Sequence, residues 1–197
     1  MNKKYEFTGE TLELYGITLH RIRAVKDFEL MDGSKVHAGD LGGWIETEDN
    51  LSHDGSAWVA DSARVAGDAR VGGNARVYGN AQVYGDAQVG GDARVYGDAQ
   101  VYDNARIRGD ARICGDARIS TTNDYIVIGP IGSRNDFTTF YKTNSDGIYV
   151  ACGCFNGDID QFIDRVKNTH GSNRHGQAYL AAAELAKIQI GGGQDDM

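Results

Sequence analysis

The chain has 197 residues, of which 24% are charged, and its formal net charge at pH 7 is −8. No apolar run is long enough to be a signal peptide or a membrane span, so we expect a cytoplasmic protein with no membrane partner. The three cysteines, Cys114, Cys152 and Cys154, cannot all pair with one another, which favours free thiols in a reducing compartment over a disulfide framework.

The charge is distributed unevenly along the chain. Residues 55–120 contain eight aspartates and eight arginines but no lysine or glutamate, so this segment is neutral and the excess of acid lies in the flanks. Within the segment, Asp and Arg lie two positions apart on one face, where we expect them to pair. A neutral segment argues against an acidic mimic of DNA, and no basic patch indicates nucleic-acid binding. We therefore expect no nucleic acid among the partners.

Residues 1–40 are predicted to form an N-terminal β-cap. The short runs KYEF, TLEL and ITLHRIRAV alternate in polarity, have strand composition and are separated by turn residues. We expect this cap to cover the open end of the segment that follows, because an exposed strand edge recruits other chains. Trp44 and Trp58 are large enough to plug that end.

Residues 55–120 are one hexapeptide written eleven times without an insertion, from GSAWVA at Gly55 to GDARIS at Ser120. A fixed six-residue period is typical of parallel β-helices. Most units begin with a glycine, which marks a corner where the chain must bend tightly. Each unit is therefore expected to be a short strand followed by a corner, and three units close one triangular coil.

The polarity within each unit predicts which side chains face the core. Alanine and valine or isoleucine lie two residues apart and must point to the same side of a strand, so Ala57 and Val59 face inward while Trp58 faces outward. Three units per coil place Val59, Val77 and Val95 above one another at the spacing of neighbouring strands, about 4.8 Å. The predicted core is a column of stacked valines and isoleucines flanked by alanines.

The residue after each inward valine or isoleucine falls on three outer faces in turn. Two of these faces carry stacked tyrosines, namely Tyr78 with Tyr96 and Tyr84 with Tyr102, whereas the third carries glycines and is flat. Stacked aromatic residues stabilise neighbouring strands, but tyrosine is also favoured at protein interfaces. The ladders are therefore either structural or a docking surface, and we take all four tyrosines as candidate binding residues.

The repeated pattern of aliphatic, any, any, polar, small and any residue resembles the hexapeptide-repeat family, a left-handed parallel β-helix best known from acyltransferases. The segment from His37 to Val59 has a GGW motif before the first coil and is similar to uncharacterised bacterial and phage members often labelled transferases. The resemblance covers about residues 20–120 and implies left-handed coils and a homotrimer. In this chain the position after the valine, often small in the family, is tyrosine in four units.

The same resemblance implies that an acyltransferase would carry a catalytic histidine near a coil corner and a loop extruded from the coils. Residues 55–120 contain neither, and the absence of histidine also argues against the zinc-binding carbonic-anhydrase variant of the fold. His53 lies just before the repeat, where a capping role is favoured. We therefore predict that the protein is not an enzyme and that it uses no cofactor. The rival interpretation is an acyltransferase site at a subunit boundary that uses His53 or His170.

Residues 121–191 lose the repeat and are predicted to form a small α+β domain. The runs DYIVIG, DFTTFYKT and DGIYVACGCF have strand composition, with a hairpin turn at residues 144–147. One helix is predicted to begin after Asp158, with Gln161 completing a capping box. A second helix, over about residues 176–188, is apolar nearly all round and is expected to be buried. Residues 192–197 are predicted to be a disordered tail.

Two polar loops of this domain contain candidate ligand-binding residues. Ser133, Arg134 and Asp136 lie in the loop GPIGSRND, and His170, Arg174 and His175 lie in the loop THGSNRH. Together these side chains could line a pocket for an anion or a polar ligand. The alternative is that both loops are polar and glycine-containing without any ligand.

Cysteine and histidine in the same domain are of the types that bind zinc. Cys152 and Cys154, with His170 and His175, form the constellation that most resembles a metal site. The Cys-x-Cys spacing is tighter than the two to four residues usually found between zinc ligands. We therefore interpret the cysteines as small core residues and predict no metal.

The sequence predicts a mainly β protein, with a left-handed parallel β-helix over residues 41–120, an N-terminal β-cap and a C-terminal α+β domain. The predicted function is a non-enzymatic binding or assembly module that self-associates, with a trimer favoured. Two alternatives stay open. One is a phage or prophage inhibitor that binds a host protein or sequesters a small ligand, and the other is a hexapeptide-type acyltransferase.

Overall fold

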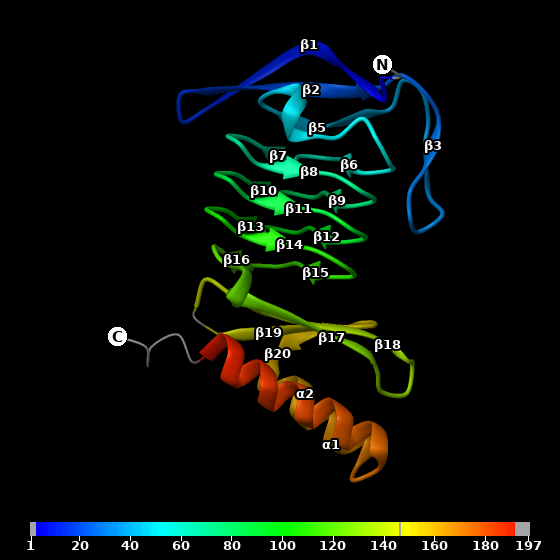
Figure 1. Cartoon of the computed structure of the whole chain (residues 1–197), viewed down its shortest axis with the longest axis vertical. Helices are drawn as coiled ribbons and strands as arrows, with labels where there is room; N and C mark the ends of the chain where they lie inside the picture. Colours follow the sequence, from blue (N-terminus) through cyan, green and yellow to red (C-terminus); the bar gives the residue numbers. More distant parts are fainter. Residues whose placement is uncertain (1–2, 146, 192–197) are drawn as a thin grey trace.

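The computed structural model describes residues 3–145 and 147–191, so the predicted disordered tail lies outside the described residues. Three parts are stacked along one axis (Figure 1): an N-terminal hairpin, a β-solenoid, and an antiparallel sheet with two helices. The mainly β fold with a small C-terminal helical part is the one predicted from the sequence. In the described part of the chain, no helix is long and apolar enough to span a membrane.

The solenoid consists of two-residue strands that recur every six residues. They are β6 (Trp58–Val59), β7 (Arg64–Val65), β8 (Arg70–Val71), β9 (Arg76–Val77), β10 (Gln82–Val83), β11 (Gln88–Val89), β12 (Arg94–Val95), β13 (Gln100–Val101), β14 (Arg106–Ile107), β15 (Arg112–Ile113) and β16 (Arg118–Ile119). Strands one coil apart pair in parallel, so that Val77 lies beside both Val59 and Val95. This is the predicted stacking. The left-handed sense of the coils stays a prediction of the family resemblance.

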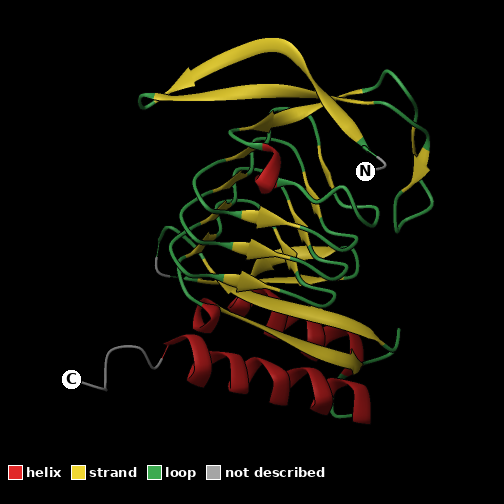
Figure 2. Cartoon of the chain, turned by 45° about the horizontal axis from the view of Figure 1, so that its top comes forward, coloured by secondary structure: helices red, strands yellow, loops and turns green. Residues whose placement is uncertain are grey.

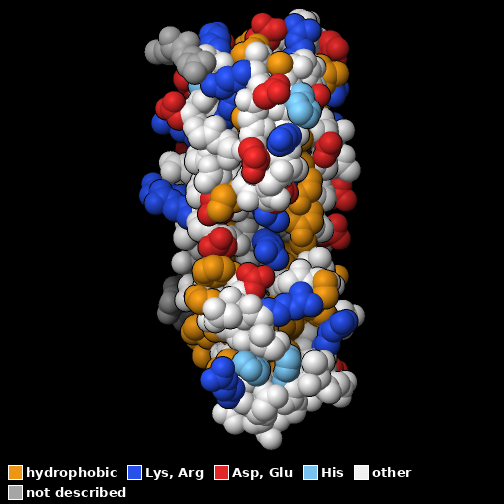
Figure 3. Space-filling model, turned by 90° about the vertical axis from the view of Figure 1, so that its right-hand side faces the viewer, with side chains coloured by type: hydrophobic (Ala, Val, Ile, Leu, Met, Phe, Trp, Pro, Cys, Tyr) orange, Lys and Arg blue, Asp and Glu red, His pale blue; other side chains and the backbone are white. Residues whose placement is uncertain are grey.

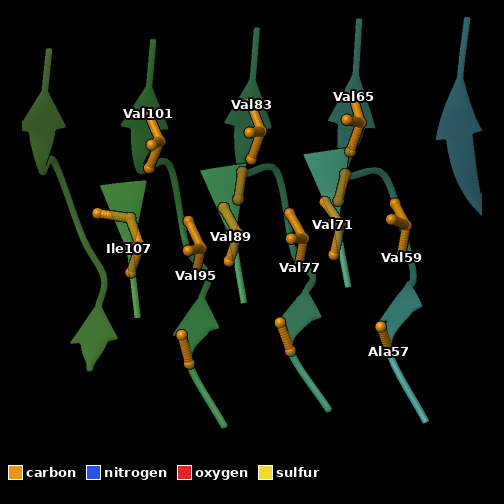
Figure 4. Close-up of a cluster of buried hydrophobic side chains, with 14 of the residues drawn as sticks. Ala57, Val59, Val65, Val71, Val77, Val83, Val89, Val95, Val101 and Ile107 are labelled. Atoms are coloured by element: carbon orange, nitrogen blue, oxygen red, sulfur yellow. The ribbon is translucent and has the colours of Figure 1, made fainter. Parts of the chain in front are cut away.

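The core of the solenoid is formed by the predicted inward positions. Every alanine, valine and isoleucine at these positions, from Ala57 to Ile119, is at most 1% exposed. Figure 4 shows the valines and isoleucines stacked in columns within the coils. Full burial of a valine side chain stabilises a fold by roughly 1.5–3 kcal/mol. The repeated aliphatic position is therefore the main energetic reason why this segment folds.

Two aliphatic rungs precede the eleven units of the repeat. Ile45, at the end of β5 (Leu41–Ile45), lies beside Val65, and Leu51 forms a bridge with Val71. Both side chains are fully buried and continue the core. The hexapeptide period does not reveal them, because the chain takes a longer path from Leu51 to the next rung and includes a 3-10 turn, η1 (Glu48–Asn50). The solenoid therefore makes about four turns.

The N-terminal hairpin extends one face of the solenoid. β1 (Tyr5–Leu14) and β2 (Ile17–Ala24) are antiparallel, β2 pairs with β5, and the resulting seven-stranded sheet has the order β1-β2-β5-β7-β10-β13-β16. The first strand edge of this face is therefore covered, as the β-cap prediction required. A second antiparallel pair lies beside the coils in Figure 1. It consists of β3 (Phe28–Glu29) and β4 (Lys35–Val36).

The prediction that Trp44 and Trp58 plug the open end is wrong. Trp44 lies beside Arg64 on the outer side of the sheet, and the guanidinium carbon of Arg21 is 5.3 Å from its ring centroid. Trp58 faces outward, as the alternation predicted, but it is buried because Phe28 packs edge-on against it, with 5.4 Å between ring centroids. Both rings follow the strand alternation, which directs them away from the axis of the coils.

A glycine and a lysine help to close the end of the first coil. Gly43 is buried, and a Cβ there would lie 2.6 Å from the carbonyl oxygen of Ala63, so this close approach requires glycine. In lower coils, each such carbonyl accepts a hydrogen bond from the coil above, but Ala57 has no coil above it. The ammonium of Lys4, which is 1% exposed, donates a 2.7 Å hydrogen bond to the Ala57 carbonyl instead.

The other end of the solenoid is covered by a four-stranded antiparallel sheet. Its strands are β17 (Tyr125–Ile131), β18 (Asp136–Lys142), β19 (Ile148–Cys152) and β20 (Phe155–Asp158), and the turn η2 (Thr122–Asp124) leads into it. Alternate residues of β18 point to opposite sides, so that Tyr141 packs against the solenoid core and Phe140 packs against the helices. Figure 2 shows α1 (Ile159–His170) and α2 (Arg174–Gly191) beyond the sheet.

The two helices differ in how well they were predicted. α1 begins at the predicted N-cap, because the Asp158 carboxylate accepts a 2.8 Å hydrogen bond from the N–H of Gln161, but the described residues lack the reciprocal bond from the Gln161 side chain that a capping box requires. The prediction that the second helix is buried all round is wrong. α2 buries one stripe that includes Ala183, whereas Leu185 is exposed and Ile188 is 72% exposed. A helix that packs on one side of a sheet buries one face, whatever its overall apolar content.

The predicted pairing of Asp with Arg within the repeat is also wrong for the described residues. Arg76 forms an ion pair with Asp32 between β3 and β4, and Arg112 forms one with Asp136 of β18, at 3.8 Å. Arg94 lies directly between these two arginines. The repeat aspartates occupy the turns rather than the strands, so their side chains do not follow the outward row of arginines.

Candidate functional site

The ladder of Tyr78 and Tyr96 is integrated into the fold. Their rings are stacked with 4.9 Å between centroids and 7° between planes, and the guanidinium carbon of Arg76 is 5.2 Å from the Tyr78 centroid. The next rung on this face is Cys114, whose sulfur lies 3.0 Å from the hydroxyl of Tyr141. Burial raises the pKa of Tyr78, and burial together with a hydrogen bond to Cys114 raises the pKa of Tyr96. These neighbours give this ladder a structural role.

The ladder of Tyr84 and Tyr102 lies in more open surroundings. Its rings are stacked with 5.3 Å between centroids and 9° between planes. Tyr84 is 37% exposed, although burial of the remainder still raises its pKa. Tyr102 is half-buried, so the ring of Tyr84 is the main aromatic surface that this ladder offers to a partner.

The β1–β2 hairpin overhangs this second ladder. In Figure 1 the hairpin reaches beyond the coils on the side of β7, β10 and β13. A groove of about 330 Å³ lies beneath it, with Ile17 and Leu19 of the hairpin on one side and Tyr84 on the other. Tyr15 at the hairpin tip is 95% exposed. We call the surface formed by Tyr15, Ile17, Tyr84 and Tyr102 the arm face.

His53 holds the N-terminal strand against the first coil. Its Nδ1 accepts a 3.2 Å hydrogen bond from the N–H of Lys4, and its ring stacks on Tyr5 with 4.3 Å between centroids. Nε2 lies 3.9 Å from the carboxylate of Glu48. Burial lowers the pKa of His53 despite this neighbouring charge. The contacts match the capping role that the sequence favoured.

The C-terminal domain contains a pocket of about 240 Å³ that three of the predicted ligand-binding residues line. Ser133 and Arg134 reach it from the turn between β17 and β18, and His170 reaches it from the end of α1. Cys152 and Cys154, at the end of β19 and in the turn to β20, also line it. The two polar loops therefore do converge.

The other three predicted residues lie outside this pocket. Asp136 begins β18 and faces Arg112 of the solenoid, with which it forms the ion pair described above. Arg174 begins α2 and is exposed, and His175 has its ring centroid 6.2 Å from that of His170 without lining the cavity. Residues that are neighbours in a loop need not share one site, because side chains change direction where the chain enters a strand or a helix.

Sequence reasoning missed Arg165 and Tyr179, which also line the pocket. Arg165 lies on the exposed side of α1, with its guanidinium carbon 5.8 Å from the ring centroid of Phe155. Tyr179 packs beneath Gly132, where any Cβ would collide with the ring. Burial and the neighbouring Cys152 raise the pKa of Tyr179, so its hydroxyl stays protonated at neutral pH. The helical spacing that brings Arg165 and Thr169 onto one side of α1 was the available signal.

The structure does not assemble the zinc-type residues into a metal centre. Within residues 3–145 and 147–191, no group of three or more His, Cys, Asp or Glu side chains has a geometry that could hold a metal ion. Cys152 instead accepts a hydrogen bond from the hydroxyl of Thr138 at 3.2 Å, and Cys154 is exposed.

The coils, the caps and the aliphatic columns together define a β-solenoid repeat protein. Within the solenoid, residues 69–85, 87–99 and 99–111 match a family model described as the YdcK beta solenoid repeat. These matches lie within the part of the solenoid that runs from β8 to β14. No curated protein matches the chain.

Proposed function

We propose that the protein is a non-enzymatic assembly module that self-associates through the arm face. The observation that carries this proposal is the exposure of Tyr15 and Ile17 on the hairpin together with that of Tyr84 on the ladder. Exposed contiguous apolar surface on a soluble protein is typical of an interaction site. The other tyrosine ladder, by contrast, is occupied by contacts within the chain.

A second copy of the chain is the partner that the charges favour. The hairpin carries exposed Glu10 and Glu13, and the solenoid face beneath it carries Arg64 and Arg118. Among the described residues, neither arginine forms an ion pair, and the Nε of Arg64 is buried without a hydrogen-bond partner. Side-by-side rods would bring the acidic hairpin of one copy over the basic face of the next, which is complementary. Rods packed in this way can close into the trimer that the family resemblance implies.

The non-enzymatic part of the proposal is supported by the histidines. Residues 55–120 contain none. The Nδ1 of His53 accepts a hydrogen bond from the N–H of Lys4, so the proton of the neutral ring is on Nε2 and neither nitrogen has a free lone pair for a substrate proton. The acyltransferase and the phage-inhibitor alternatives both stay predictions from sequence.

The test is the mass of the protein in solution, measured by sedimentation or by light scattering after gel filtration. Tyr15→Ser alone, and Tyr84→Ser with Tyr102→Ser, should weaken association while the circular dichroism keeps its β signature, because these rings lie outside the solenoid core. An aromatic anchor central to an interface contributes about 2 kcal/mol, or roughly a 30-fold change in dissociation constant.

Gly90→Arg is the matched control on the flat face. A side chain at this position meets open space within the chain, so the variant should fold and keep the mass of the wild type. A monomeric wild type, or equal masses for the wild type and both tyrosine variants, would reject the arm face as the interface. Loss of association in Gly90→Arg alone would place the interface on the flat face instead.

A further inference from the structure

The pocket of the C-terminal domain is basic on its polar side. Arg134, Arg165 and His170 line it, and no aspartate or glutamate does so among the described residues. In Figure 3, basic side chains and histidines gather on this face over the C-terminal sheet and helices. A concave site lined by one sign of charge concentrates ligands of the opposite sign.

The two guanidinium groups are held in place without being neutralised. Arg134 lies over the turn between β19 and β20, where a Cβ on Gly153 would be 2.8 Å from its Nη1, and its Nη2 is 3.8 Å from the sulfur of Cys154. Arg165 is positioned over the ring of Phe155. Neither guanidinium forms an ion pair with a described carboxylate, in contrast to Arg76 and Arg112 of the solenoid.

The rest of the pocket combines hydroxyl donors with an apolar wall. Ser133 and Thr169 supply hydroxyl groups, and Phe155, Phe162 and Val166 supply apolar surface. Tyr179 also lines the pocket, but its hydroxyl already has Cys152 and Ser133 as hydrogen-bond partners. At about 240 Å³ the cavity is smaller than the roughly 300–1,000 Å³ of pockets for drug-sized ligands, so the ligand must be small.

We propose that this pocket binds the phosphate group of a small phosphate monoester whose body is apolar. Arginine offers a planar fork of N–H donors that matches the oxygens of phosphate, and two such forks suit a doubly charged group. The hydroxyl groups complete the set of donors, and the aromatic wall packs against the body of the ester. This binding site is independent of the arm face and does not rest on the proposed assembly.

Titration calorimetry of the purified full chain tests the proposal, with inorganic phosphate and phenyl phosphate as probes at constant ionic strength. Phenyl phosphate should bind more tightly than inorganic phosphate, because it alone can use the apolar wall. Arg134→Gln and Arg165→Gln should each raise the dissociation constant of phenyl phosphate at least about tenfold, since each removes charged hydrogen bonds. Both arginines are exposed, so these variants should fold.

Arg174→Gln is the matched control, because Arg174 is an exposed arginine of the same domain that does not line the pocket. It should leave the dissociation constant within about twofold of wild type. A second readout uses the wild type alone. Cys154 lies beside Arg134, so bound phenyl phosphate should slow its alkylation by iodoacetamide, followed by mass spectrometry.

If the two probes bind equally tightly and both arginine variants still weaken binding, the pocket is an anion site whose ligand is free phosphate and not a monoester. The proposal is overturned if neither probe binds, or if Arg174→Gln weakens binding as much as Arg134→Gln and Arg165→Gln do. Alkylation of Cys154 at an unchanged rate in saturating phenyl phosphate would place any binding outside this pocket.

Discussion

The buried ammonium of Lys4 predicts that the stability of this protein rises with pH in the mildly alkaline range. Burial, with repulsion from Lys26, lowers the pKa of Lys4 from 10.5 to about 8, although the charge of Asp54 opposes the shift. Below pH 8 the side chain is protonated in both the folded and the unfolded chain. Between about pH 8 and 10.5 the folded chain releases this proton first, so the unfolded chain binds more protons and the free energy of unfolding increases.

The size of the effect follows from the two pKa values. Each unit of difference corresponds to about 1.4 kcal/mol, and between about pH 7 and pH 9.5 the linkage relation gives a gain of about 2 kcal/mol. The deprotonated amine still donates a hydrogen bond to the carbonyl of Ala57, so this contact persists across the titration. Buried tyrosines have a raised pKa in the folded chain, so above their unfolded pKa, near 10, they lower the free energy of unfolding. Measurements of the Lys4 effect should therefore stay below about pH 10.

Urea denaturation of wild type and Lys4→Met, at intervals from about pH 7 to pH 9.5, measures the effect. Lys4→Met leaves the Ala57 carbonyl without a donor, which costs a constant amount, so the difference between the two proteins isolates the ionisation. The wild type should gain about 2 kcal/mol relative to the variant over this range. Lys3→Met is the control, because Lys3 is exposed and pairs with Glu48 at 2.7 Å. A difference independent of pH would refute the account of Lys4.

Three further predictions concern stability and can be checked by thermal or urea denaturation. Val95→Asp buries an unpaired carboxylate and should cost several kcal/mol, whereas Arg94→Ala on the outer face should cost under about 1 kcal/mol; equal losses would reject the inward register. Gly132→Ala forces a Cβ into a tyrosine ring of α2 at a φ of +71°, and should cost more than about 2 kcal/mol, while Gly90→Ala meets open space and should cost under about 1 kcal/mol. Leu185→Lys should change stability by at most about 0.5 kcal/mol, because α2 leaves Leu185 exposed; a large loss would indicate a buried helix.

The solenoid was predictable because two periods in its sequence agree. The six-residue period places the corners, and the two-residue spacing of alanine and valine assigns the inward side of each strand, so every rung from Val59 to Ile119 followed without further information. Ile45 and Leu51 escaped because their segment lacks the repeated alanine and the regular spacing. Their place in the core becomes clear only from the strands with which they pair, and the sequence period does not reveal this pairing.

The ends of the solenoid were predicted in kind but not in detail. Large aromatic side chains were expected to cover the first coil, yet strand alternation turned Trp44 outward, and Gly43 and Lys4 make close contacts there instead. A buried lysine is unexpected from sequence, because burial of an ammonium is costly unless it is hydrogen-bonded. The cost is offset where terminal carbonyl groups would otherwise have no donor.

Three of the six candidate ligand-binding residues of the C-terminal domain line one pocket. Ser133, Arg134 and His170 come together there because both loops lie at the same end of the domain. Composition could not exclude Asp136, which becomes the first residue of β18 and faces the solenoid. It could not include Arg165 either, because that residue enters the site from the side of a helix.

The two tyrosine ladders show how identical repeat chemistry acquires different roles. Each ladder is one tyrosine stacked on another at successive coils, and nothing within the repeat distinguishes them. The difference comes from the flanking parts of the chain. On the ladder that contains Tyr96, Tyr141 of the C-terminal sheet packs against the next rung, Cys114. Above Tyr84, by contrast, the hairpin leaves a groove. In a repeat protein the coils supply equivalent surfaces, so the non-repeating caps decide which surface remains free to bind a partner.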